Sequence, residues 1–127
     1  MRFAPFCFLP IAILLVGCGG QKDPVMAHGK PVDHWLGELN NADAKARKKA
    51  VTSVGHVGTA DARAIPALIG AVKDRDATVR GEAIVALLNI GPDAKDAILV
   101  LREAENDKDA TVRSHAKKAL ARIQGGQ

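Results

Sequence analysis

Residues 74–91 read DRDATVRGEAIVALLNIG, and the pattern of this stretch returns on both sides of it at one constant spacing. Arg47, Arg80 and Arg113 are each separated by 33 residues. The same spacing relates further sets of positions: Asp43, Asp76 and Asp109; Ala50, Ala83 and Ala116; Val54, Leu87 and Leu120; Val57, Ile90 and Ile123. Repetition at a fixed period of this size is typical of a solenoid, in which each unit buries its apolar stripe only against its neighbours.

Within each repeat, apolar residues recur at helical spacing. Three long helices are predicted: residues 44–57, 77–90 and 110–123. An aspartate precedes each of them, where its carboxylate can accept orphan backbone N–H groups. A shorter helix precedes each long one, and a glycine suited to a left-handed helix end follows it: Gly58, Gly91 and Gly125. The sequence therefore predicts an all-α fold, a short α-solenoid of about three helix pairs over residues 30–127.

The composition limits the chain to one small domain with an aliphatic core. Its 127 residues are 47% hydrophobic and 25% charged, which is ordinary for a single globular domain. Beyond residue 10 the only aromatic residue is Trp35, so Ala, Val, Leu and Ile must form the core. The net charge of +4 is small for a nucleic-acid-binding protein, and no aromatic stacking platform is present, so no nucleic acid partner is expected.

The N-terminal residues have the pattern of an export signal. One basic residue, Arg2, precedes an apolar run over residues 3–16, which is shorter than the roughly 20 residues of a membrane span. The run ends in LVGC at residues 15–18, which resembles the lipobox of bacterial lipoproteins. The resemblance implies a signal peptide over residues 1–17 and a lipidated Cys18. The alternative is a plain signal peptide with Cys18 as an ordinary thiol.

Residues 18–29 are then expected to be the lipidated cysteine and a flexible tether, because this stretch is rich in glycine and lacks an apolar period. The expected location is the periplasmic face of a bacterial cell membrane, where the lipid anchors the exported protein. Gly19 rather than Asp follows Cys18. If the familiar enterobacterial sorting pattern applies, this favours the outer membrane.

The repeat itself resembles the HEAT-like repeat of bacterial and phycobilisome-lyase-type proteins, with the pattern Asp-x-x-Val-Arg-x-x-Ala-x-x-Ala-Leu-x-x-Ile-Gly. The second unit matches it from Asp76 and Arg80 to Gly91, and the third from Asp109 and Arg113 to Ile123. The first unit departs from it at three positions: Ala46, Ser53 and Val54. The resemblance implies that the Asp and Arg of the pattern link adjacent units, which is a structural role.

Candidate sites are few. No histidine, cysteine, aspartate or glutamate stands in a catalytic or metal-ligand spacing, so the chain is not expected to be an enzyme or to hold a metal or cofactor. The short helices are expected to line the concave face, where a protein segment would bind. The candidate residues on that face are His34, Arg63, Ala67 and Val100. Trp35 and Leu36 are expected to remain partly exposed at the N-terminal end, as a contact for a partner or a homodimer.

Basic residues form two clusters on the long helices: Lys45, Arg47, Lys48 and Lys49; Arg113, Lys117, Lys118 and Arg122. The long helices are expected to form the convex layer. A solvated surface is one interpretation of these clusters, and contact with an anionic surface or an acidic partner is the other.

The resulting functional hypothesis is a membrane-tethered, non-catalytic HEAT-repeat lipoprotein that serves as a protein–protein interaction or scaffolding module with an unknown protein partner. The alternative is an accessory protein that docks on anionic lipid or polysaccharide through its basic convex face. A third hypothesis, a lyase-like chaperone for a bound pigment or cofactor, rests on the family resemblance alone.

Overall fold

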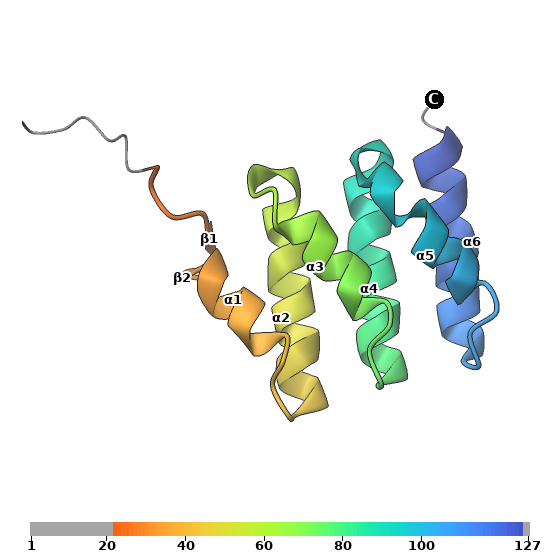
Figure 1. Cartoon of the computed structure of the whole chain (residues 1–127), viewed down its shortest axis with the longest axis horizontal. Coiled ribbons are helices and arrows are strands. Elements are labelled where there is room, and N and C mark those ends of the chain that lie inside the picture. Colours follow the sequence, from red (N-terminus) through yellow and green to blue (C-terminus); the bar gives the residue numbers. More distant parts are fainter. Residues whose placement is uncertain (1–21, 126–127) are drawn as a thin grey trace, which may run out of the picture.

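The structure, a computed structural model, describes residues 22–125. These residues form six α-helices in three consecutive pairs: α1 (Val32–Glu38) with α2 (Ala44–Val57), α3 (Ala64–Ala71) with α4 (Ala77–Ile90), and α5 (Ile98–Ala104) with α6 (Ala110–Gly125). Figure 1 shows the long helices α2, α4 and α6 side by side in one layer, with the short helices α1, α3 and α5 in a second layer across them. The predicted all-α solenoid is confirmed.

The ends of the long helices follow from the predicted capping residues. The Asp43 carboxylate accepts from the backbone N–H groups of residues 45 and 46. Asp76 and Asp109 make the equivalent bonds to the first turns of α4 and α6. Gly58 (φ 54°) and Gly91 (φ 74°) end α2 and α4 in the left-handed region and lead into the 3₁₀ segments η1 (Gly58–Ala60) and η2 (Gly91–Ala97). The predicted ends of α2 and α4 are therefore confirmed, whereas α6 continues through Gly125, which was expected to follow it.

The long helices pack against one another more closely than the short helices do. Helix α2 contacts α4, and α4 contacts α6, along their length, whereas each short helix mainly contacts the long helices beside it. Small residues permit this approach: a Cβ atom on Gly55 would lie 2.8 Å from the Cβ of Ala86. An array bends toward its more closely packed layer. The long helices therefore form the inner layer, and the short helices do not line the concave face as the sequence analysis expected.

The core is aliphatic, and one aromatic residue closes its N-terminal end. Trp35 is only 4% exposed, because its indole Nε1 donates to the backbone oxygen of Ala27 at 2.8 Å. Ala27 belongs to a small antiparallel hairpin of β1 (Met26–Ala27) and β2 (Lys30–Pro31), and the turn between them has positive φ at His28 (48°) and Gly29 (73°). The expected exposure of Trp35 is therefore wrong.

The same hairpin changes the expected boundary of the tether. Val32 N–H donates to the oxygen of Val25 at 2.9 Å, which extends the ordered contacts back to residue 25. All of residues 18–29 were expected to belong to the lipidated cysteine and tether, but the folded part already includes residues 25–29. The predicted signal peptide, Cys18 and the start of the tether lie outside the described residues.

The close packing of α2 on α4 is testable. Gly55→Ala should destabilise the protein by about 1–3 kcal/mol, because its Cβ would collide with Ala86 and overpacking outweighs the better helix propensity of alanine. The control is Gly37→Ala in α1, where the added Cβ meets nothing within 4 Å; this change should be neutral or stabilise by up to about 1 kcal/mol. Urea unfolding followed by circular dichroism measures both. Equal effects of the two substitutions would contradict the packing argument.

Candidate functional site

The arginines of the repeat pattern tie each unit to the next. The guanidinium of Arg47 donates from Nε and Nη2 to the two carboxylate oxygens of Asp74, at 2.9 and 3.0 Å. Its Nη1 donates to the backbone oxygens of Asn41 and Ala42, at 2.9 and 3.0 Å. One side chain of α2 therefore holds both its own α1–α2 loop and the turn that precedes α4.

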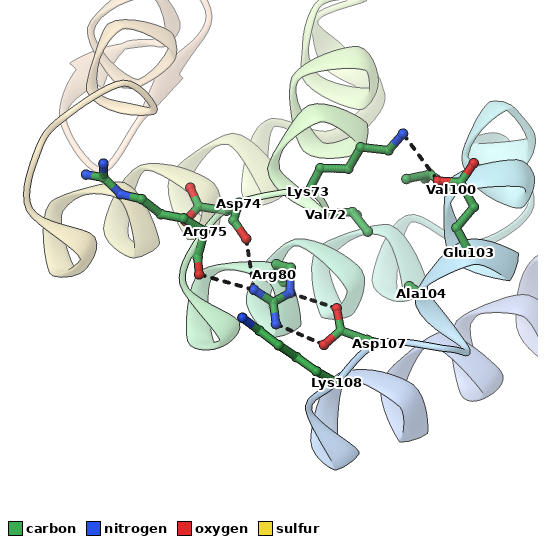
Figure 2. A pocket seen from close by; sticks show the side chains of 10 residues that line it. All are labelled: Val72, Lys73, Asp74, Arg75, Arg80, Val100, Glu103, Ala104, Asp107 and Lys108. Carbon is green, nitrogen blue, oxygen red and sulfur yellow. Dashed lines mark hydrogen bonds and ion pairs between the residues drawn. The ribbon is translucent and has the colours of Figure 1, made fainter.

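The next junction repeats this geometry, as Figure 2 shows. Arg80 donates from Nε and Nη2 to Asp107 at 2.8 and 2.9 Å, and from Nη1 to the oxygens of Asp74 and Arg75 at 2.9 and 3.3 Å. The Arg80 and Asp107 side chains are only 7% and 13% exposed. Hydrogen bonding to Arg80 holds the pKa of Asp107 below its usual range, although burial opposes this shift. The structural role implied by the resemblance agrees with these contacts.

The carboxylates in these bridges are not the ones that the repeat pattern contains. Asp76 and Asp109 cap helices, whereas Asp74 and Asp107, two residues earlier, accept from the arginines of the preceding unit. The two aspartates of each turn are coupled, since the N–H of Asp76 donates to the Asp74 carboxylate at 2.8 Å and Asp109 does the same to Asp107. The family resemblance implied that the aspartate of the pattern makes this link, and the structure shows that the aspartate two residues earlier makes it.

Two equivalent grooves lie between the short helices, and these are the candidate interaction surface. The N-terminal groove, of about 400 Å³, is lined by Leu36, Leu39, Asn40, Val51, Ala67, Gly70, Ala71, Asp74 and Val79. The C-terminal groove, of about 640 Å³, is lined by Val72, Lys73, Asp74, Arg75, Arg80, Val100, Glu103, Ala104, Asp107 and Lys108. Several lining positions correspond at the 33-residue spacing: Leu39 and Val72, Ala67 and Val100, Gly70 and Glu103, Ala71 and Ala104.

The two grooves differ in their chemistry. The N-terminal groove has Gly70 and Asn40 where the C-terminal groove has Glu103 and Lys73, and Lys73 Nζ lies 3.2 Å from the Glu103 carboxylate across the groove. Figure 2 shows this ion pair above the apolar side chains of Val72 and Val100. The N-terminal groove therefore has uncharged residues at these two positions, whereas a surface ion pair spans the C-terminal groove.

The structure brings only part of the predicted partner-binding set to these grooves. Ala67 lines the N-terminal groove and Val100 the C-terminal one, where Val100 is 6% exposed and serves as floor rather than as a free contact. His34 instead lies beside Trp35, with Nε2 3.1 Å from the Nζ of Lys30. Neither His34 nor Arg63 lines a groove.

Arg63 belongs to a surface ion-pair cluster instead. It donates to Asp61 in its own loop and to Asp33 of the preceding unit. Hydrogen bonds from Arg63 lower the pKa of Asp61 to about 2. With two carboxylates on its guanidinium, Arg63 serves as a surface link between the first and second units.

The first predicted basic cluster has one exposed cation fewer than expected. Arg47 is 4% exposed and pairs with Asp74, so it is not part of the basic surface. Of the remaining cations, Arg113 is partly exposed and the others are exposed: Lys45, Lys48 and Lys49 on α2; Lys117, Lys118 and Arg122 on α6. They lie on the long helices, which form the inner layer and not the convex one.

A third concavity, of about 260 Å³, lies over the long helices and was missed by sequence reasoning. Its polar lining includes Lys48, Glu82, Asp109 and His115. The Nδ1 atom of His115 is buried and has no hydrogen-bond partner among residues 22–125. The repeat spacing could have indicated this site, because Glu82 and His115 occupy equivalent positions on α4 and α6.

The comparisons with known proteins agree with this geometry. The family model of HEAT repeats matches residues 32–121. The chain belongs to the HEAT repeat family. A crystal structure of an engineered protein from the Northeast Structural Genomics Consortium is 25% identical and has a TM-score of 0.57 over 75% of this chain, which spans only 46% of that protein. No curated protein matches the chain.

Two further observations concern the HEAT repeat domain. Within residues 22–125, no helix combines the length and apolar character that crossing a membrane requires. Over the same residues, His, Cys, Asp and Glu side chains do not gather in groups of three that could hold a metal ion.

The bridge at the second junction gives a testable prediction. Asp107→Ala should lower the free energy of unfolding by about 3 kcal/mol at pH 7, because it leaves the buried Arg80 without its carboxylate. Asp96→Ala in η2, which removes an exposed carboxylate, is the matched control and should change stability little. Urea unfolding at several pH values measures both effects.

The pH dependence of the same comparison follows from the lowered pKa of Asp107. A carboxylate whose folded pKa is depressed stabilises the fold above its unfolded pKa of about 3.9, and this contribution disappears as the pH falls through the folded value. The difference between wild type and Asp107→Ala should therefore shrink below about pH 4. A difference that stays constant down to pH 2 would contradict the charged bridge.

Proposed function

We propose that this HEAT repeat protein is a membrane-tethered lipoprotein that acts as a non-catalytic protein–protein interaction module. The observation that carries the proposal is the N-terminal groove, in which the partly exposed side chains of Leu36 and Leu39 lie beside the small residues Ala67 and Gly70. Small side chains let a partner segment approach closely, and buried apolar surface supplies the main driving force of association.

The lipid anchor is proposed from the LVGC motif. Cys18 would carry the lipid, and only six residues separate it from Val25, the first residue bonded to the folded domain. The steps from Cys18 to Val25 reach about 25 Å when the chain is extended, so the domain would stay close to the bilayer surface. More than one acyl chain is needed for stable anchoring, which fits the chemistry of a lipidated N-terminal cysteine. Outer-membrane placement remains part of this proposal.

The exposed cations support the alternative, docking on anionic lipid or polysaccharide. Lys45, Lys48 and Lys49 line one stretch of α2 without a carboxylate partner among the described residues. Binding of such exposed charges to an anionic surface weakens strongly with salt, whereas an apolar protein contact weakens less. Salt dependence therefore separates the two functions.

The groove proposal predicts the effect of one substitution. Gly70→Arg should abolish partner capture from crosslinked membranes, because the new side chain fills the N-terminal groove while its Cβ meets nothing within 4 Å. Gly37→Arg is the matched control, since Gly37 is also exposed in a short helix with free space around it but lies outside the grooves. Mass spectrometry identifies the captured proteins. Equal capture by both variants at high salt would count against the groove.

The anchor proposal predicts the effect of removing the thiol. Cys18→Ala should move the protein from the membrane fraction to the soluble fraction, because the lipid can no longer be attached. Mass spectrometry of the wild-type N-terminus should show an acylated Cys18 as its first residue. An unmodified Cys18 in a membrane-bound protein would refute the lipoprotein assignment and leave the groove proposal untouched.

A further inference from the structure

The third arginine of the repeat series, Arg113, is held in the same way as the first two. Its Nη1 donates to the backbone oxygens of Asp107 and Lys108, at 2.8 and 3.0 Å. Arg47 and Arg80 use the carbonyls at the same two positions before them. The loop between α5 and α6 therefore orients the guanidinium of Arg113 as the other two are oriented.

Arg113 differs from the other two in its remaining donors. In Arg47 and Arg80, Nε and Nη2 point to the two oxygens of one carboxylate, 27 residues further along the chain. No carboxylate among residues 22–125 accepts from these atoms of Arg113. An arginine in this orientation therefore binds a carboxylate at both junctions between units. Arg113 has the same orientation and is partly exposed.

The surface around Arg113 is cationic where the earlier units are apolar. Val51 and Ile84 occupy one position of the repeat and are both completely buried. The equivalent residue on α6 is Lys117, which is exposed, and the neighbouring Lys118 is exposed as well. An apolar helix pair could stack there only by burying a lysine, which is unfavourable unless the charge is paired. The end of the array therefore suits an acidic partner.

We propose that this end surface, formed by Arg113, Lys117 and Lys118, binds an acidic protein segment, and that one Asp or Glu carboxylate of this segment pairs with Arg113 as Asp74 pairs with Arg47. The inference rests on the proposed role of the protein as an interaction module. It adds the chemistry of a partner and a second binding surface, distinct from the grooves.

The other end of the chain shows why the partner is not a second copy stacked head to tail. The position that holds Asp74 and Asp107 in the later units is Asn41 in the first, and Asn41 donates to Glu38 within its own unit. The hairpin and Trp35 also cover that end. A second copy therefore offers no aspartate at the required place.

The test uses the purified full chain with Cys18→Ala and a capped peptide of residues 103–109, EAENDKD, which is the segment that supplies Asp107. The signals of the arginine Nε–H groups are followed by NMR during titration. We expect the Arg113 signal to shift with a dissociation constant in the millimolar range, while those of Arg47 and Arg80 stay unchanged. A peptide in which every Asp is Asn and every Glu is Gln should give no shift.

Two variants separate a paired carboxylate from general charge attraction. Arg113→Lys keeps the charge but loses the planar fork, so binding should weaken at least fivefold. Arg75→Lys, a substitution at another exposed arginine, is the matched control and should bind as the parent does. Thermal unfolding must show that both variants remain folded. Equal binding by the two variants would overturn the assignment to Arg113.

Vesicles test the competing class of ligand. If phosphatidylglycerol vesicles shift the Arg113 signal and the acidic peptide does not, the surface binds lipid and the inference is wrong. If neither probe shifts it, the inference is also wrong. If the peptide does not bind at Arg113 but Gly70→Arg still abolishes partner capture, the proposed function stands and only this inference is wrong. If the peptide does not bind and Gly70→Arg also leaves capture unchanged, the proposed interaction role is wrong as well.

Discussion

The buried bridge from an arginine of one unit to an aspartate of the next is the interaction on which the array depends. A repeat unit of two helices cannot bury its apolar stripe alone, so the relative placement of units determines whether a core exists. Arg47 bonds to two carbonyls of its own loop and to the Asp74 carboxylate of the following turn. It thereby satisfies backbone oxygens at a helix connection and sets the register between units with one planar group.

The two ends of the array described by residues 22–125 follow from the same constraint, because within these residues the first and third units each contact one other unit. At the N-terminal end, the short hairpin of residues 26–31 accepts the indole N–H of Trp35 and covers the apolar surface. At the C-terminal end, Lys117 replaces the buried Val51 and Ile84 of the earlier units and stays in solvent. The hairpin covers the N-terminal end, whereas exposed lysine side chains cover the C-terminal end. The two ends therefore differ in what they can bind.

The candidate binding surfaces follow from the difference between the two layers. Gly55 and Ala86 bring α2 and α4 into close contact, and α4 also contacts α6, while the short helices stand further apart and leave grooves between them. In the N-terminal groove, Leu36 and Leu39 stay partly exposed beside the small residues Ala67 and Gly70. In the C-terminal groove, Lys73 and Glu103 pair across the opening. The repeats thus share one backbone geometry and differ in the surfaces they offer.

The sequence by itself determined the period of 33, the starts of the long helices and the capping role of Asp43, Asp76 and Asp109, because these depend on local backbone chemistry that repeats along the chain. It also indicated that the arginines are structural. Which residues of distant segments contact one another could be seen only in the tertiary structure. Asp74 rather than Asp76 accepts from Arg47, since only the packed helices decide which of two nearby carboxylates faces the guanidinium.

The burial of individual side chains was also decided by tertiary packing. Val100 and Ala67 are equivalent in sequence, yet Val100 is 6% exposed and Ala67 only partly buried, because the neighbours of each unit differ. Trp35 is covered by a hairpin whose residues show no apolar period, so no sequence pattern predicted it. The curvature, which places the long helices inside, depends on how closely small residues let these helices approach. The sequence thus determined the repeating unit, and three-dimensional packing decided which surfaces the units leave open.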